Sequence, residues 1–265
     1  MRKEKLLNIS NKYIYFRKIL EKFNFRIVVN ANPNGRRAVE KGELCKRSNG
    51  NDVDLNRNWN YNWNKNIGLP TEENPGDKPF SEVETLFVHD SLKNFKADIF
   101  LSVHSGVYGL FIPYAFNKKE CKKNNAAMKT VLNKIKHKFC SVCQLGSPAL
   151  LIGYKSSGTC LDYAFKKLNV PYAFAWEIYT NEIALPDMEE KLKFNTNSSF
   201  LEEKAEFMDK NSIKNYSKNY SEFKKELLSG RKTIFTEEEN EICFALFNPL
   251  DKQHYDYILN NWAGV

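Results

Sequence analysis

Residues 97–104 read Ala97-Asp-Ile-Phe-Leu-Ser-Val-His104, and residues 171–179 read Pro171-Tyr-Ala-Phe-Ala-Trp-Glu-Ile-Tyr179. Both runs are short and apolar at nearly every position, which is typical of strands buried on both faces of a sheet. Each run carries one polar residue at or near its end, His104 or Glu177. Because ligands of open α/β sheets bind at the carboxyl ends of strands, these two residues are the first candidates for a functional site.

Helical patterns lie between the apolar runs. Ser81 and Glu84 form a capping-box sequence that predicts a helix to about Asn94. Further helices are expected at residues 12–22, 124–138, 160–168 and 237–262, and further strands at Phe25–Ala31, closed by the turn Asn32-Pro-Asn-Gly35, and at Leu110–Phe116. This alternation predicts an α/β fold with a mixed, mostly parallel sheet flanked by helices.

The composition bounds the domain organisation. With 265 residues, 42% hydrophobic and 14% aromatic, the chain can bury a core of ordinary size. We expect a single domain over residues 1–265, with a charged insertion at about residues 185–236. Residues 36–80 are polar and too long for a simple connection, so we expect a functional loop there.

The formal net charge of +8 raises the question of nucleic-acid binding. The lysines are scattered and not gathered in one stripe with aromatic residues, so we expect no nucleic-acid partner. We also expect no membrane partner, because no apolar run approaches the length of a bilayer span. The start Met1-Arg-Lys-Glu-Lys5 is not followed by the apolar core of a signal peptide.

Six cysteines are too few for a disulfide scaffold at this length. Cys140-Ser-Val-Cys143 lacks a second pair at zinc-site spacing, which favours ordinary thiols or one local disulfide.

Each candidate site residue also has a structural interpretation. A single histidine at a strand end, such as His104, is often only a hydrogen-bonded structural residue. A glutamate within an apolar strand, such as Glu177, needs a cation, a metal-bound water or a raised pKa. Arg57, in Asp54-Leu-Asn-Arg-Asn-Trp59, suits either carboxylate binding or a structural pair with Asp54.

Seven motifs in a fixed order narrow these alternatives. They are Asn32-Pro-Asn-Gly35, Cys45-Lys-Arg47, Asp54-Leu-Asn-Arg-Asn-Trp59, Pro79-Phe-Ser-Glu-Val-Glu-Thr85, Leu101-Ser-Val-His-Ser105, Gly153-Tyr-Lys-Ser-Ser-Gly158 and Phe174-Ala-Trp-Glu177. In this order, over roughly residues 25–180, the sequence resembles the zinc carboxypeptidase family of the carboxypeptidase A type. The stretch Cys243-Phe-Ala-Leu-Phe-Asn-Pro249 also looks like that family.

The resemblance implies an enzyme, a metallocarboxypeptidase that hydrolyses C-terminal residues from peptides or proteins. It implies that His104 is one ligand of a single zinc ion. It implies that Glu177 is the general base acting on a water and that Arg47 stabilises the oxyanion.

The same resemblance assigns the substrate contacts. Asn56 and Arg57 would hold the free carboxylate of the peptide, Tyr154 would close over the terminal residue, and Ser105 with Gly106 would line the cleft. Leu161, before Asp162-Tyr163, would line the pocket for the terminal side chain and suggests an apolar terminal residue.

One part of the family pattern is missing. The other two zinc ligands come from a His-x-x-Glu pair upstream of the Asn-Pro turn, and this sequence has no such pair; its histidines are His89, His104, His137 and His254. Only one of three expected ligands is therefore present, and the first strands of the family sheet are also missing. Two explanations compete, a sequence truncated at its N-terminus or a degenerate relative that binds peptide C-termini without cutting them. A secreted or vacuolar location is what the resemblance implies.

Overall fold

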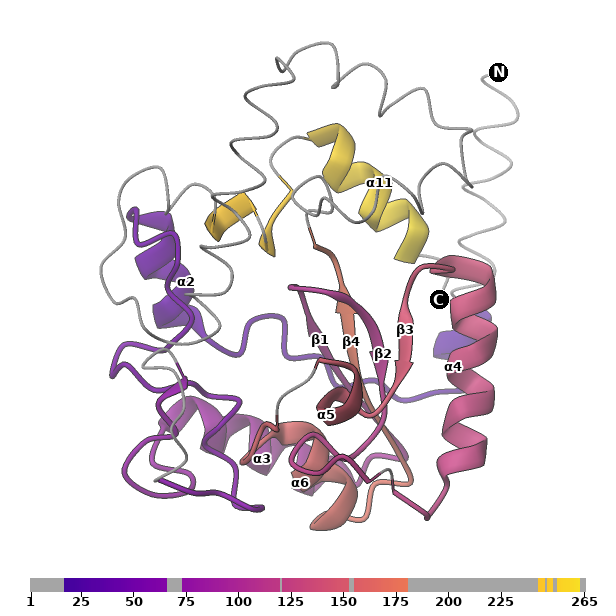
Figure 1. The fold of residues 1–265 in the computed structure, drawn as a ribbon, viewed down its shortest axis with the longest axis horizontal. Coiled ribbons are helices and arrows are strands. Elements are labelled where there is room, and N and C mark those ends of the chain that lie inside the picture. The colour runs from indigo at the N-terminus through magenta and orange to yellow at the C-terminus, as the bar shows by residue number, and fades with distance from the viewer. Residues whose placement is uncertain are drawn as a thin grey trace.

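A mixed sheet of four strands in the order β1-β4-β2-β3 organises the part of the chain that the structure describes (Figure 1). The structure is a computed structural model that describes residues 17–65, 73–119, 121–152, 155–180, 243–245, 247–249 and 252–262. The strands are β1 (Ile99–His104), β2 (Tyr108–Phe111), β3 (Gln144–Gly146) and β4 (Tyr172–Ile178). β1 pairs with β4 and β2 with β3 in parallel, while β2 and β4 are antiparallel. The predicted α/β class with a mixed, mostly parallel sheet is confirmed.

Helices surround this sheet. They are α2 (Pro33–Glu40), α3 (Val83–Phe95), α4 (Asn125–Phe139), α5 (Pro148–Leu151), α6 (Cys160–Lys166) and α11 (Lys252–Trp262). Helix α4 runs beside β3, and α11 lies across one end of the sheet (Figure 1). Trp262 of α11 donates from Nε1 to the carbonyl of Ile178 at 3.2 Å and packs its ring against Trp176. The predicted terminal helix therefore docks back onto β4.

The main core lies between β2, β4, α4 and α6. It is built from apolar residues of these elements and their connections, namely Leu110, Ile112, Cys121, Met128, Leu132, Cys140, Cys143, Leu161, Phe165, Ala173 and Phe174. Helix α4 contacts β3, whereas α6 contacts β4 and β1, so the two helices together reach both edge strands of the sheet.

The outer face of β1 has a different environment. Its alternate residues Ile99, Leu101 and Val103 are exposed, while Phe100, Ser102 and His104 are half-buried. The strand is therefore covered on one face only, and the candidate site residue His104 lies on the covered face.

The predicted strand at residues 25–31 is wrong. The structure assigns no strand to these residues, and Val29 is 94% exposed. Arg26 ties the segment to α3 by donating to the carbonyl of Ser91 at 3.0 Å and by lying over the ring of Phe95. A β-branched run becomes a strand only where another strand offers backbone partners, and within the described residues this run has none.

Two predicted local features differ in detail. The expected turn at Asn32 is instead the start of α2, since Asn32 Oδ1 accepts a hydrogen bond from the Gly35 N–H at 2.9 Å. The expected capping box of α3 is wrong, because Glu82 stands at the N-cap. The Ser81 hydroxyl is occupied elsewhere, accepting from Asn58 Nδ2 and donating to Glu82 Oε1.

Two disulfides are present. Cys140 and Cys143 form the local bond that the sequence allowed, at the end of α4. A second bond, between Cys45 and Cys243, was not predicted. Cys121 and Cys160 are free and buried.

Three earlier expectations fall partly or wholly outside the described residues, among them the helix at 237–262, of which residues 243–245, 247–249 and 252–262 are described. The charged insertion at 185–236 lies wholly outside, and the expected helix at 12–22 is described only from residue 17. Within the described part of the chain, no helix combines the length and apolar character needed to cross a bilayer.

Candidate active site

His104 and Glu177 lie side by side at the carboxyl ends of two parallel strands. They are register partners in the β1–β4 pairing, which follows from the equal offset of both residues from Ile99 and Tyr172. Directly paired residues of neighbouring strands project to the same face of a sheet. The sequence-based expectation that these two side chains converge at one sheet end is therefore met by the register.

The His104 ring is held by a neighbour on its own strand. Its Nε2 lies 2.6 Å from Ser102 Oγ, and Cys160 Sγ lies 3.5 Å from the same hydroxyl. Burial, and next the positive charge of Arg47, lower the pKa of His104 to about 4, although Asp54 opposes this. The ring is therefore neutral near pH 7, which is the state in which a histidine can act as a metal ligand.

Burial shifts Glu177 toward its neutral form as well. Burial raises the pKa of Glu177 to about 7, against the opposing effects of Arg47 and of the Val107 backbone N–H. Its Oε2 is buried and makes no hydrogen bond to any residue that the structure describes. A carboxyl group that titrates near neutral pH can both take up and release a proton, as a general base must.

Arg47 and Asp54 are charged neighbours of His104 and Glu177, and we call them the border of the candidate site. Arg47 Nε donates to Asp54 Oδ2 at 2.8 Å, and Arg47 remains partly exposed. Burial alone would raise the pKa of Asp54, but Arg47, Arg57 and the Asn56 N–H hold it below its usual range. The anchored guanidinium is thereby kept near His104 and Glu177, whose pKa values it influences.

Arg57 is buried and pairs with a carboxylate that the sequence did not reveal. Its Nε donates to Glu73 Oε2 at 3.0 Å, and Nη2 lies 2.8 Å from Glu73 Oε1. Nη1 donates to the carbonyl of Asn56 at 2.9 Å and lies 4.0 Å from Asp54 Oδ2. The pairing of Arg57 with Asp54 is therefore the weaker of its two carboxylate contacts, since Glu73 lies closer.

Asn56 is oriented by α6. Its Oδ1 accepts a hydrogen bond from the Cys160 N–H at 2.9 Å, which directs the amide nitrogen Nδ2 away from that helix end. The loop ahead of α6 approaches closely here, because Trp59 N–H donates to the carbonyl of Gly158 at 3.0 Å. A Cβ on Gly158 would lie 2.1 Å from the Arg57 carbonyl oxygen, so only glycine fits this approach.

The other predicted substrate residues occupy different surroundings. Ser105 is half-buried in the loop after β1, next to Gly106. Leu161 is 2% exposed and packs in the main core beside Phe165 and Phe174. Tyr154 lies outside the described residues.

Phe247 is a neighbour of the site that sequence reasoning missed. Its ring carbon Cε1 lies 3.0 Å from the position that a Cβ on Gly106 would take, and Glu177 Oε2 lies 3.6 Å from the same point. The signal available was the resemblance of Cys243–Pro249 to the family, but no spacing relates that stretch to Glu177. Glu73 gave no signal, because it lies in a polar loop without periodicity.

In the part of the chain that the structure describes, the side chains that could coordinate a zinc ion do not form a complete set of ligands. Zinc sites in enzymes use three protein ligands and a water. Neutral His104 suits one of these positions, but the described residues contain no group of three His, Cys, Asp or Glu side chains that could hold a metal. The described residues thus do not complete a zinc site.

Comparison with solved structures gives the fold. The carboxypeptidase A of Helicoverpa armigera is similar over 63% of this chain and 47% of its own, with a TM-score of 0.50 and 22% identity. Bovine thrombin-activatable fibrinolysis inhibitor, solved in complex with a tick carboxypeptidase inhibitor, is 25% identical over 47% of this chain and 45% of its own, with a TM-score of 0.42. This chain therefore spans under half the length of the solved structures it matches.

Comparison with sequences gives the family. No curated protein matches the chain. The family model described as zinc carboxypeptidase matches residues 4–208, a stretch that includes β1, β4 and the predicted site residues up to Glu177. The chain belongs to the zinc carboxypeptidase family.

Proposed function

We propose that the chain forms the substrate-binding and general-base part of a carboxypeptidase site, one that hydrolyses the C-terminal residue of peptides or proteins. The observation that carries this proposal is the in-register pairing of His104 with Glu177, beside the anchored Arg47. The family assignment supports hydrolysis of peptide bonds by a zinc-dependent enzyme.

Asn56 and Arg57 supply the proposed contacts to the free carboxylate of the substrate. A guanidinium has five N–H groups. In Arg57, Nε and Nη1 each donate one described hydrogen bond, and Nη2 forms an ion pair with Glu73 Oε1 that engages one of its N–H groups. One N–H on each terminal nitrogen remains, and such a pair matches the two oxygens of a carboxylate. The Nδ2 of Asn56 adds a donor from the neighbouring position.

Glu177 and Arg47 supply the proposed chemistry. Glu177 accepts a proton from the attacking water and passes it to the leaving amine, which its pKa of about 7 permits in both directions. Arg47, held by Asp54, donates hydrogen bonds to the oxyanion as it forms on the scissile carbonyl.

Leu161 is proposed to select an apolar terminal residue. It is the residue that precedes Asp162 on α6 and is a member of the apolar main core. Peptides that end in Phe or Leu should therefore be preferred over peptides that end in Lys or Asp. Equal rates for both groups would remove this part of the proposal.

A second candidate function is binding of peptide C-termini without cleavage. The observation that favours it is the ligand set, in which His104 is the only predicted zinc ligand among the described residues. Both functions share Asn56 and Arg57 and differ only in whether a metal can be held.

Metal content and cleavage distinguish the two functions. We would measure bound zinc by mass spectrometry and release of C-terminal residues for the chain as given, beside a form that includes any coding sequence upstream of Met1. The enzyme proposal expects one zinc and cleavage in the extended form, abolished by Glu177→Gln. Peptide binding without zinc in either form would leave only the second function.

A further inference from the structure

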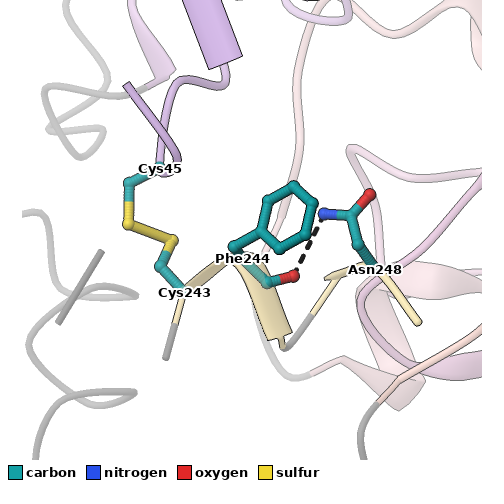
Figure 2. The surroundings of a disulfide bond; sticks show 4 residues. All are labelled: Cys45, Cys243, Phe244 and Asn248. Carbon is teal, nitrogen blue, oxygen red and sulfur yellow. Dashed lines mark hydrogen bonds between the residues drawn. A yellow bond between two sulfur atoms is a disulfide. The ribbon is translucent and has the colours of Figure 1, made fainter. Parts of the chain in front are cut away.

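The Cys45–Cys243 disulfide joins the border of the proposed site to a distant part of the chain. The two cysteines are 198 residues apart in sequence. Cys45 lies two residues before Arg47 and is half-buried, whereas Cys243 is buried and begins the segment that contains Phe247. Figure 2 shows the bond with Phe244 directly after Cys243 and with Asn248 facing Phe244.

The segment after Cys243 has a defined local shape. The Asn248 N–H and its Nδ2 both donate to the carbonyl of Phe244, at 2.9 and 3.0 Å. These two hydrogen bonds to one carbonyl fix the turn that carries Phe247. The place where this turn lies on the domain therefore determines where the Phe247 ring lies.

Besides the buried side chains of Cys243 and Ala245, a hydrogen bond and a ring contact fix that position. Tyr179 Oη donates to the carbonyl of Ala245 at 3.3 Å, and the Phe247 ring rests on Gly106 next to Glu177 Oε2. A single neutral hydrogen bond stabilises a segment only weakly. A disulfide between distant residues, in contrast, removes much of the freedom of the two parts that it joins.

We propose that the Cys45–Cys243 disulfide holds Phe247 in place as a wall of the substrate site, and that reduction of this bond by a dithiol detaches the wall and weakens the binding of a peptide C-terminus. The identity of the ligand rests on the proposed function. The device itself rests on the disulfide, the Phe244–Asn248 turn and the contact of Phe247 with Gly106.

The reduction is a two-electron exchange. A thiolate of the dithiol attacks Sγ of the half-buried Cys45, the Cys45–Cys243 bond breaks, and Cys243 leaves as a thiolate that takes up a proton. The second thiol of the reagent then displaces Cys45 from the mixed disulfide. The reagent ends as a cyclic disulfide, and both cysteines end as thiols.

The chain carries its own control. Cys140 and Cys143 are both buried in the main core, away from the Arg47 border. The free thiols of Cys121 and Cys160 are buried as well. Under mild reduction, the Cys45–Cys243 bond should open first, because exchange requires access to a sulfur.

The experiment uses the full chain and N-acetylphenylalanine as the probe. After graded reduction with dithiothreitol and alkylation, mass spectrometry reports which cysteines are free, calorimetry gives the Kd, and hydrogen exchange follows peptides covering residues 104–108 and 243–249. Opening of Cys45–Cys243 should raise the Kd at least fivefold and speed exchange in both peptides. The Cys45→Ser/Cys243→Ser variant should show the weak Kd without reductant, and Cys140→Ser/Cys143→Ser should respond like the unaltered chain. Phe247→Ala should weaken binding with the disulfide intact.

Two outcomes would overturn the inference. The first is an unchanged Kd once Cys45 and Cys243 are fully alkylated. The second is unchanged hydrogen exchange on reduction. This outcome decides when the oxidised chain binds no N-acetylphenylalanine, because the proposed function has then failed and no Kd can be compared. Faster exchange on reduction then supports the detachable wall, and unchanged exchange refutes it.

Discussion

Glu73 pairs with two nitrogens of Arg57: Nε donates to Oε2 at 3.0 Å, Nη2 forms an ion pair with Oε1 at 2.8 Å, and both side chains are buried. The pair holds the guanidinium by its side. Under the proposed function, the terminal edge of Arg57 is left for the carboxylate of the substrate, and Glu73 positions Arg57 without contacting the substrate itself.

Glu73→Gln should destabilise the fold, because it leaves a buried guanidinium without its counter-charge. Breaking a buried ion pair from one side costs about 3 kcal/mol or more. Urea denaturation measures this loss. The matched control is Glu40→Gln, which breaks the exposed Arg36–Glu40 pair and should cost less than about 0.5 kcal/mol. Equal midpoints for the two variants would show that Arg57 does not depend on Glu73.

Gly106→Ala should impair both stability and peptide binding. Gly106 has a φ of +143°, and an added Cβ would meet the Phe247 ring at 3.0 Å. Gly42→Ala separates the two effects, because Gly42 has a φ of +108° and nothing within 4 Å of an added Cβ. We expect a loss of about 1 kcal/mol for Gly42→Ala with binding unchanged. We expect a larger loss for Gly106→Ala together with weaker binding, and normal binding by this variant would argue against Phe247 as a wall.

Asp162→Asn should change the pH dependence of stability. Burial raises the pKa of Asp162 to about 7, although the Ala115 and Phe116 N–H groups oppose this. Because the native pKa exceeds the unfolded value of 3.8, the stability that Asp162 contributes is present below that value and is lost as the pH rises through about 7. The stability of the Asn variant relative to the unaltered chain should therefore improve by about 2–4 kcal/mol between acidic and mildly alkaline pH. Parallel stability curves for the two proteins across this range would contradict the assignment.

Cys160 should resist alkylation in the native state. Burial raises the pKa of Cys160 to about 11, and the thiolate is the reactive form. Iodoacetamide should leave Cys160 unmodified near neutral pH and label it fully after unfolding in guanidinium chloride, as read by mass spectrometry. Ready labelling of the folded protein would show that the Ser102–Cys160 contact opens in solution.

The helices and strands that the sequence predicted well are those whose conformation follows from the residues within the element itself. The strands β1 and β4 are apolar runs, and the helices α4 and α6 have apolar residues at helical spacing. All four elements are bounded by polar residues or proline and appear near the expected positions. Residues 25–31 have the composition of a strand, yet a strand also needs a partner, and composition contains no information about partners.

The candidate site divides in the same way. His104 and Glu177 could be found because each is a polar residue at the end of an apolar run. The pairing of Arg57 with Glu73 could not be found, since several acidic residues of the same region, Asp54 among them, were available and only the loop path selects between them. The Cys45–Cys243 bond was equally inaccessible, because six cysteines permit many pairings and spacing does not choose among them.

The Cys45–Cys243 bond also makes the chain a closed loop from residue 45 to residue 243. A protease that cuts once between residues 47 and 243 therefore does not release a fragment. The product is a two-chain molecule, with Arg47 on one piece and Phe247 on the other, that separates on a gel only after reduction. Arg47 and Phe247 would thus remain covalently connected after a cut that ends the continuity of the backbone between them.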